Sequence, residues 1–337
     1  MKQEKFKVVI GILAFLMVIL LGGTVVHAQP KTITMKWADF MASKASTHIY
    51  LNHVKEAVEL RTRGQVKIEI FPAGSLVDGR GMLEAGRAGL ADVVFVMPSY
   101  FPSAFPMGYY AYVVPFGPTL DTILAILDEA RPLLEQECAA NGLKYLESCP
   151  ISQEWYFNRP INLDAPDWRG MKLRALGGLM EVMAKELGAG LVSLSSSEAT
   201  VALSTKVVDG INSSYTSYYN AGIYKAAPYV LLTRAMVAAL NIWAFNLDRW
   251  KNLPQNIQDI ISEEFRRVRN EWLIEYIRKE EMECLKLAEK GGSVIMIPTP
   301  AQKKIWEQKM TSTWNVLPQK AGAKGQTYLD IIKKHMK

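Results

Sequence analysis

The sequence predicts an α/β protein built from two lobes, on three observations. Stretches with strand-like patterns alternate along the chain with stretches of helical periodicity, which is typical of a largely parallel sheet covered by helices. The chain has 337 residues, more than a single hydrophobic core usually holds. Its apolar fraction of 49% is that of an ordinary globular protein. We therefore expect two α/β lobes.

The first lobe is predicted from five elements between Thr32 and Val96. Alternation of polar and apolar residues predicts strands, and the 3.6-residue period predicts helices, one of them ending near Gly64. The run Asp92 to Val96 is continuously apolar after its first residue, as in strands buried on both faces. In order, the expected elements are a strand at 32–37, a helix at 46–63, a strand at 66–71, a short helix at 81–88 and a strand at 92–96.

The middle of the chain is expected to cross into the second lobe. The aromatic and Pro-rich stretch 98–118 reads as neither regular helix nor strand, and either lines a cleft or covers a core edge. Beyond it we expect a helix at 121–141, a strand at 143–146, second-lobe strands at 171–175 and 208–212, and a returning strand at 240–245.

One long helix is expected from Pro254 to Lys290, stopped by Gly291-Gly292. Its apolar positions do not keep strict heptads, which argues against a coiled-coil partner helix. At 1.5 Å per residue it would be about 55 Å long, enough to run along both lobes. These positions are Ile257, Ile260, Ile261, Phe265, Val268, Trp272 and Tyr276.

These elements give expected boundaries. Residues 29–152 and 239–278 are assigned to lobe I, residues 153–238 and 279–330 to lobe II, and residues 331–337 to a C-terminal tail.

Residues 1–28 read as a cleavable secretory signal. Lysines open the segment, an apolar run from Val8 to Leu21 follows, and Val26-His27-Ala28 is a small-residue cleavage site. The apolar run is short for a membrane span, which needs about 20 residues. No cysteine precedes Cys138, so lipid attachment at the signal is excluded. We expect an exported protein.

Composition weighs against several function classes. The net charge of +6 comes from interspersed charges, which argues against nucleic acid as a partner. No zinc spacing, phosphate loop, nucleophile elbow or paired-carboxylate motif is found, so we expect neither an enzyme nor a metal or other cofactor. The three cysteines are interpreted as buried or free thiols, with a Cys138–Cys149 disulfide as the alternative.

The strongest candidate binding residue is Arg174. It stands at the end of a short apolar strand, in the run WRGMKLRA. The guanidinium is a planar, permanently charged fork that pairs with carboxylates through two hydrogen bonds. A surface salt bridge is the alternative role.

Several motifs in order resemble one family over most of the chain. They are GQVKIEIFPAGSLVDGRGMLEAGRAGLADVVF, WRGMKLRA, SSSEATVALSTKVVDG and the helix after NLPQNIQDII. The resemblance is to the DctP-type solute-binding proteins of tripartite ATP-independent periplasmic (TRAP) transporters. It implies a two-lobed periplasmic binding-protein fold with a central ligand cleft, hinge strands and a long lobe-spanning helix.

The resemblance also implies a function. The protein would capture a small organic acid, pair its carboxylate with Arg174, and deliver it to the small and large permease subunits in the membrane. The alternatives are a receptor that feeds a sensor kinase and a C4-dicarboxylate binder. An exported enzyme is disfavoured because no catalytic constellation is found.

Departures from the family bear on the ligand. Gln153 stands where sialic-acid binders carry a second arginine, and keto-acid binders use a glutamine there. Asn212 and Ser213 replace the Glu-Trp pair with which keto-acid binders hold a metal ion, so no bound cation is expected.

Other pocket positions are less polar than in sugar-acid binders. Phe40, Met97 and Tyr100 replace an asparagine, a glutamate and an arginine of those proteins. A second carboxylate would lack a partner here, and an unpaired buried charge is costly. We therefore expect a keto or aromatic monocarboxylate.

Aromatic side chains complete the expected site. Trp155, Tyr215 and Trp243 offer stacking surface and hydrogen-bond donors near predicted strand ends. Tyr218 and Tyr219 are weaker candidates, because neighbours at the start of a helix cannot both face one cleft.

Overall fold

The computed structural model describes residues 32–111, 119–194, 196–232 and 237–336. The expected signal segment, residues 1–28, lies outside these ranges. Residues 1–33 and 34–337 form two separate units, and the description below concerns the second. Within the described ranges, no helix has both the length and the apolar character needed to cross a membrane.

The first of two sheets has the strand order β2-β1-β3-β10-β4. β1 pairs with β3 in parallel, whereas β10 runs antiparallel to both β3 and β4. The two long strands, β4 and β10, therefore lie side by side and carry the chain out of this sheet and back into it. The strands are β1 (Ile33–Ala38), β2 (Val66–Phe71), β3 (Val93–Val96), β4 (Leu143–Ser152) and β10 (Val237–Asn246).

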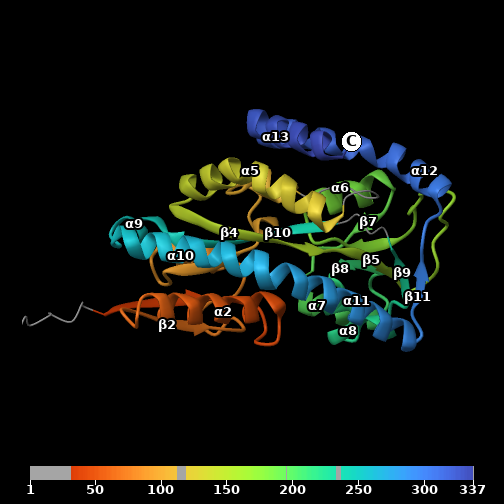
Figure 1. The fold of residues 1–337 in the computed structure, drawn as a ribbon. Coiled ribbons are helices and arrows are strands. Elements are labelled where there is room, and N and C mark those ends of the chain that lie inside the picture. The colour runs from red at the N-terminus through yellow and green to blue at the C-terminus, as the bar shows by residue number, and fades with distance from the viewer. Residues whose placement is uncertain (1–31, 112–118, 195, 233–236, 337) are drawn as a thin grey trace, which may run out of the picture. The chain divides into compact units, whose positions relative to one another are not determined.

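Helices cover both faces of this sheet (Figure 1). One face packs against α5 (Leu120–Ala140) in a core that includes Val94, Ile126 and Ile242. The other face carries an aromatic cluster beneath α2 and α10. The remaining elements here are α2 (Ser46–Arg61), α3 (Met82–Arg87), a 3₁₀ turn (Pro98–Tyr100), α4 (Pro106–Tyr110) and α9 (Leu247–Lys251).

The second sheet has the order β11-β9-β5-β8-β6-β7. β5 is antiparallel to β8 and β9, while β6 is parallel to β8 and β7. Its strands are β5 (Glu154–Phe157), β6 (Lys172–Arg174), β7 (Gly190–Leu191), β8 (Gly210–Ser213), β9 (Tyr229–Leu231) and β11 (Val294–Met296). The helices around it are α6 (Leu179–Glu186), α7 (Ser196–Ser204), α8 (Tyr215–Asn220) and a 3₁₀ turn (Ile223–Lys225). The fold is thus the expected two-lobed α/β arrangement.

The long helix passes alongside both sheets but is interrupted. α10 (Gln255–Val268) packs on α2 and β4, and α11 (Ile274–Lys290) packs on α8 (Figure 1). Between them Arg269–Leu273 forms a π-turn, in which the Ile274 N–H donates to the Arg269 carbonyl. The sequence predicted one uninterrupted helix. The extra residue in this turn moves the inward face by one position, so that Leu273, Ile274 and Ile277 are buried instead of Trp272 and Tyr276.

The C-terminal region forms α12 (Pro300–Met310), a 3₁₀ turn (Thr311–Asn315) and α13 (Val316–His335). α13 packs on α4 and α5, with Tyr328, Leu329 and Ile332 in the core over the first sheet. It differs from the sequence expectation, in which 279–330 belonged to lobe II and 331–337 formed a tail. Burial of apolar side chains holds this helix against the first lobe, and the other lobe boundaries stay a prediction.

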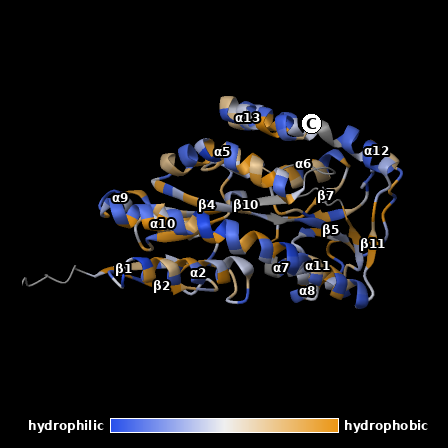
Figure 2. Ribbon diagram, viewed as in Figure 1, coloured by the Kyte–Doolittle hydropathy of each residue, from blue (hydrophilic) through white to orange (hydrophobic). Residues whose placement is uncertain are grey.

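The remaining expected elements agree with the structure to within three residues at their ends, except that β4 extends to Ser152, six residues beyond the strand expected at 143–146. The helix ending near Gly64 and the strand Val66–Phe71 are confirmed, and Gly64 has a left-handed φ of 77°. Within 98–111 the aromatic stretch contains two short helical turns that the sequence did not predict. Helices mix apolar and polar residues along their length, as expected for one buried face and one solvent face (Figure 2).

Candidate ligand-binding site

Arg174 ends β6 with its side chain 3% exposed. Its Nε donates to the Leu194 carbonyl and its Nη1 to the Asn212 carbonyl, each at 3.1 Å. Both bonds fix the plane of the guanidinium at the edge of the second sheet. The parallel strands β6 and β8 end at this same edge, which is where open α/β sheets bind ligands.

Three expected site residues lie together on the neighbouring strands. Trp155 of β5 and Asn212 of β8 are direct partners in the antiparallel ladder, so their side chains share one face about 5 Å apart. Gln153 precedes Trp155 by two residues, the spacing that returns to the same face of an extended chain. Gln153, Trp155 and Asn212 are at most 5% exposed. Ser213 pairs with Glu154 and is half-buried.

The apolar site residues meet this group from the first lobe. Met97 follows β3 and belongs to the same buried cluster as Trp155, while Phe40 and Tyr100 pack against that cluster. The Phe40 and Tyr100 rings are 6.2 Å apart. The structure therefore brings together Phe40, Met97, Tyr100 and Trp155, although they come from strands that lie far apart in the sequence.

Two other expected residues are placed differently. Trp243 lies mid-strand in β10, with its ring 4.5 Å from that of Tyr50 and 5.0 Å from that of Phe95. It thus belongs to the aromatic core of the first lobe rather than to a strand end. Tyr215 begins α8 and donates from its hydroxyl to Glu154 at 2.8 Å. Whether either residue contacts a ligand stays a prediction.

Tyr218 and Tyr219 make contacts within the second lobe. Tyr218 stacks on Tyr156 at 3.9 Å and donates to the Ala227 carbonyl. Tyr219 stacks on Tyr224 at 5.5 Å. Both contacts stabilise the second lobe.

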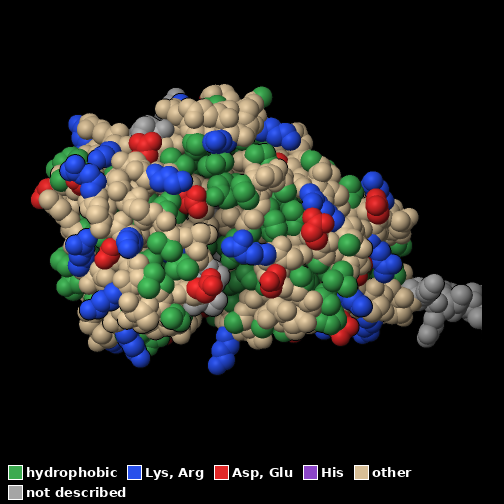
Figure 3. Space-filling model, turned by 180° about the vertical axis from the view of Figure 1, so that it is seen from behind, with side chains coloured by type: hydrophobic (Ala, Val, Ile, Leu, Met, Phe, Trp, Pro, Cys, Tyr) green, Lys and Arg blue, Asp and Glu red, His purple; other side chains and the backbone are tan. Residues whose placement is uncertain are grey.

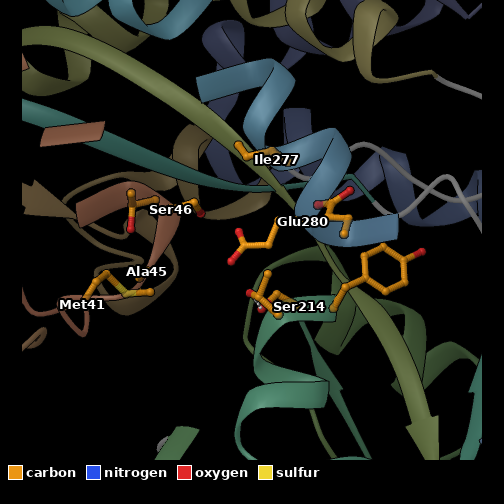
Figure 4. Close-up of a pocket in the computed structure, with 10 residues that line it drawn as sticks. Met41, Ala45, Ser46, Ser214, Ile277 and Glu280 are labelled. Atoms are coloured by element: carbon orange, nitrogen blue, oxygen red, sulfur yellow. Dashed lines mark hydrogen bonds between the residues drawn. The ribbon is translucent and has the colours of Figure 1, made fainter. Parts of the chain in front are cut away.

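A small pocket lies between the start of α2, the start of α8 and the side of α11. Ser46 and Ser214 line it from opposite sides, and Glu280 reaches in from α11 (Figure 4). Its volume of about 40 Å³ is enough for ordered water. Burial raises the pKa of Glu280, a hydrogen bond with Ser46 opposes this, and nearby Glu283 adds to the rise.

A tyrosine of the first lobe reaches the segment that follows Arg174. A Cβ placed on Gly177 would lie 3.3 Å from the Tyr109 hydroxyl. Burial raises the pKa of Tyr109, a hydrogen bond from the Gly178 backbone lowers it, and the Glu181 carboxylate, which accepts from the hydroxyl, raises it. Tyr109 therefore connects α4 to the start of α6.

The α4 helix that carries Tyr109 is itself anchored. The buried Glu137 of α5 accepts hydrogen bonds from the Met107 and Gly108 N–H groups at 2.7 and 2.9 Å. A carboxylate at this end of a helix satisfies otherwise unpaired donors. No local pattern indicated this contact, because it joins residues about 30 positions apart.

Two further groups near the site were missed by sequence analysis. Arg80 lies over the Tyr100 ring, 5.5 Å from its centroid, and this cation is exposed. Buried His48 lies 3.0 Å from Asp39, and Asp39 also accepts from the Met41 N–H at 2.8 Å. The Asp39–His48 pair thus shapes the turn that presents Phe40.

The His, Cys, Asp and Glu side chains of the described residues form neither a metal-binding group nor a disulfide. No group of three or more His, Cys, Asp or Glu side chains in the described ranges is arranged to hold a metal ion. Cys138, Cys149 and Cys284 are separate buried thiols, as the favoured interpretation held. Burial raises the pKa of each thiol, that of Cys284 to about 11.

Charges on the face shown in Figure 3 are of both signs and interspersed. Apolar side chains also gather near the middle of this face.

Two α/β lobes with a buried arginine at a strand end are the arrangement expected of a bacterial extracytoplasmic solute-binding protein. The model of the DctP family, described as "Bacterial extracellular solute-binding protein, family 7", matches residues 37–320. The chain therefore belongs to the DctP family, as the sequence motifs indicated. It is a TRAP-type solute-binding protein.

Curated relatives are distant but extend over much of the chain. The C4-dicarboxylate-binding periplasmic protein DctP of Vibrio cholerae is 23% identical over 308 residues, 88% of this chain and 90% of the relative. A monocarboxylate 2-oxoacid-binding periplasmic protein of Nostoc is 26% identical over 231 residues, 64% of this chain and 60% of the relative.

Solved structures confirm the fold. A TRAP solute-binding protein from Desulfovibrio salexigens with bound orotic acid has a TM-score of 0.81 and 20% identity, covering 90% of this chain and 99% of its own. A marine metagenome TRAP protein in complex with pyroglutamate, from an unidentified microbe, has a TM-score of 0.80 and 19% identity, covering 90% and 99%.

Proposed function

We propose that this protein is the periplasmic receptor of a TRAP transporter, exported by its signal segment, and that it captures a small monocarboxylate of keto or aromatic type. It would deliver this acid to the two membrane permease subunits without altering it chemically. The observation that carries the proposal is Arg174, buried and oriented by two backbone carbonyls at the end of β6. A guanidinium held in this way is suited to bidentate pairing with a carboxylate.

The other expected site residues support a ligand with one carboxylate. Phe40, Met97 and Trp155 supply apolar surface, and Gln153 is neutral. A second carboxylate placed among these side chains would lose hydration without gaining a cation. Relatives and similar structures that bind a 2-oxoacid, orotic acid and pyroglutamate by name also favour small organic acids.

A C4-dicarboxylate is the second candidate ligand. The Vibrio cholerae relative is named for this ligand class, and Arg80 over Tyr100 places an exposed cation beside the apolar group. If a dicarboxylate bound, Arg80 is the side chain we would assign to its second carboxylate.

A thermal-shift panel tests the proposal. Keto and aromatic monocarboxylates should raise the melting temperature more than succinate, malate or sialic acid do. A ligand at 100 times its Kd stabilises by about 2.7 kcal/mol. The largest shift from a dicarboxylate or from sialic acid would overturn the monocarboxylate assignment. Recovery of the bound acid unchanged after incubation distinguishes a receptor from an enzyme.

Delivery to a sensor kinase instead of a permease gives a different membrane partner. Crosslinking of the loaded protein in its native membranes, followed by identification of the captured chain, separates the two. Capture of a kinase ectodomain and not of permease subunits would contradict the transport role.

A further inference from the structure

A groove with a volume of about 360 Å³ lies between α8 and α11, which pack side by side in the second lobe (Figure 1). Sites for small molecules usually have volumes of about 300 to 1,000 Å³. The described residues that line this groove include none of those assigned to the organic acid. The groove is therefore a candidate for a second site with a different ligand.

Two tyrosines supply aromatic walls for the groove. Tyr276 of α11 stacks on Trp272, with the ring centroids 4.7 Å apart. Tyr219 of α8 stacks on Tyr224 at 5.5 Å. These stacking partners restrict the movement of both tyrosine rings. Because the face of an aromatic ring attracts cations, the walls are suited to an organic cation.

Two carboxylates give the groove a negative charge. Glu280 and Glu283 line it one turn apart on α11, and neither forms a salt bridge with another described residue. Lys279 also lines the groove. Its charge is offset by the Glu275 carboxylate, which lies 3.5 Å from the Lys279 Nζ. An unpaired cation would therefore find two carboxylates here that lack a partner of opposite charge.

The thiol of Cys284, which also lines the groove, responds to the same charges. Its pKa is raised to about 11, first by burial and then by the carboxylates of Glu280, Glu283 and Glu281. A negative potential disfavours the thiolate just as it disfavours any other anion. The groove would therefore repel the carboxylate ligands that we expect at Arg174, and it would attract cations.

We infer that this groove is a second binding site, for a small organic ammonium ion held between the two tyrosine rings and paired with Glu280 and Glu283. The inference goes beyond the capture of an organic acid. Glu280 also lines the small pocket between the lobes, where it meets Ser46 of α2 (Figure 4). The ammonium ion would thus contact a side chain that also touches the first lobe.

Two compounds of the same shape test the inference on the purified protein. Choline carries a trimethylammonium group, and 3,3-dimethylbutan-1-ol carries an uncharged tert-butyl group in its place. Calorimetry at low ionic strength, where charges are least screened, should show saturable binding of choline at least about 10-fold tighter than that of the alcohol. Equal affinities, or no saturable binding of choline at millimolar concentrations, would overturn the inference.

Matched variants locate the site. Glu283→Gln removes one carboxylate and Tyr276→Leu removes one ring, and each should weaken the binding of choline by about 3- to 10-fold. Glu289→Gln is the control, because Glu289 is an exposed carboxylate of the same helix that does not line the groove. This variant changes the net charge by the same amount as Glu283→Gln and should leave the affinity unchanged.

The variants also distinguish a site from general attraction to an acidic surface. An equal loss of affinity in Glu289→Gln and Glu283→Gln would show such general attraction and would overturn the inference. Circular dichroism checks that Tyr276→Leu remains folded, and Glu283→Gln gives the result on an exposed position if it does not. The proposed receptor function is tested separately by the acid panel.

Discussion

The Nη1 of Arg269, the first residue of the π-turn, lies 3.2 Å from the Oε1 of Glu147 in the middle of β4. Its Nη2 also lies 2.8 Å from Asp128 of α5, and Arg131 of α5 pairs with Glu147 at 2.6 Å. Arg269 and Glu147 are almost completely buried. The interruption of the long helix is therefore tied to the strand that carries the chain toward the second sheet.

We expect Arg269→Met to lower the free energy of unfolding by about 3–5 kcal/mol, because it leaves the buried Glu147 with one fewer cation. Urea unfolding measures this change. Lys279→Met is a control on the same long helix, since its exposed pair with Glu275 at 3.5 Å should contribute at most about 1 kcal/mol. A loss for Arg269→Met no larger than that of the control would contradict the prediction.

The π-turn is also expected to act as a hinge. π-turns often occur at functional positions within helices, and this one lies between the parts of the helix that pack on the two lobes. Solution scattering should show a smaller radius of gyration in the loaded protein than in the empty one, through hinge closure. Equal radii at saturation would indicate a rigid pocket.

Arg174→Lys should weaken binding of the preferred acid by about 2–5 kcal/mol, nearly as much as Arg174→Ala. Lysine keeps the charge but not the planar fork. Calorimetry gives the affinities, and circular dichroism checks that both variants remain folded. Near-native affinity in the lysine variant would show that charge alone suffices and that bidentate pairing is not used.

Tyr109→Phe should raise the dissociation rate of the ligand by about 2- to 10-fold, the value of one hydrogen bond, with little change in the association rate. The lost hydroxyl is the one that meets Gly178 and Glu181 across the two lobes. Tyr110→Phe is the control on the adjacent residue, whose pKa is raised by burial and by nearby Glu181 but without a hydrogen bond. Stopped-flow fluorescence measures both rates, and equal dissociation rates for the two variants would refute a connecting role.

Glu280 should make stability depend on pH. Its folded pKa is raised above the ordinary value of 4.5, so the folded chain binds more protons than the unfolded chain just above that pH. The contribution of Glu280 to stability is therefore present below about pH 4.5 and is lost as pH rises through the folded pKa. The melting temperature of Glu280→Gln minus that of the wild type should therefore increase as pH rises from 4 to 7.

Glu283→Gln provides the matched comparison. Removing this neighbouring carboxylate should lower the pKa of Glu280 and weaken the pH dependence of the wild type. A difference between Glu280→Gln and the wild type that stays constant from pH 4 to pH 7 would show that the Glu280 carboxyl titrates normally.

Sequence patterns predicted elements better than they predicted contacts between elements. The strand Val66–Phe71 and the position of Arg174 at a strand end follow from local alternation and from the family motif. The π-turn could not be predicted, because it depends on Arg269 meeting Glu147 and Asp128 from distant elements. Trp243 shows the same limit, since an aromatic residue in a strand gives no local signal that distinguishes core from cleft.

The site was predictable to a similar degree. The family resemblance singled out Gln153 and Asn212, and the aromatic pattern singled out Trp155; the ladder between β5 and β8 places Trp155 and Asn212 on one face. Tyr109 and Arg80 were missed because each acts through a partner far away in the chain, Glu181 and Tyr100 respectively. Only the folded arrangement shows such pairs.

Chemical modification of the three separate thiols would report whether a molecule of this protein has unfolded. Reaction with alkylating or oxidising reagents requires the thiolate, and Cys138 and Cys149 are fully buried with pKa values raised by that burial. A chain that stays closed keeps these sulfurs reduced even among oxidants, whereas a chain that opens exposes them and can be trapped in mispaired or crosslinked forms. In an oxidising compartment, molecules that fold slowly or reopen would therefore be lost to oxidation, whereas molecules that fold quickly and remain folded would persist.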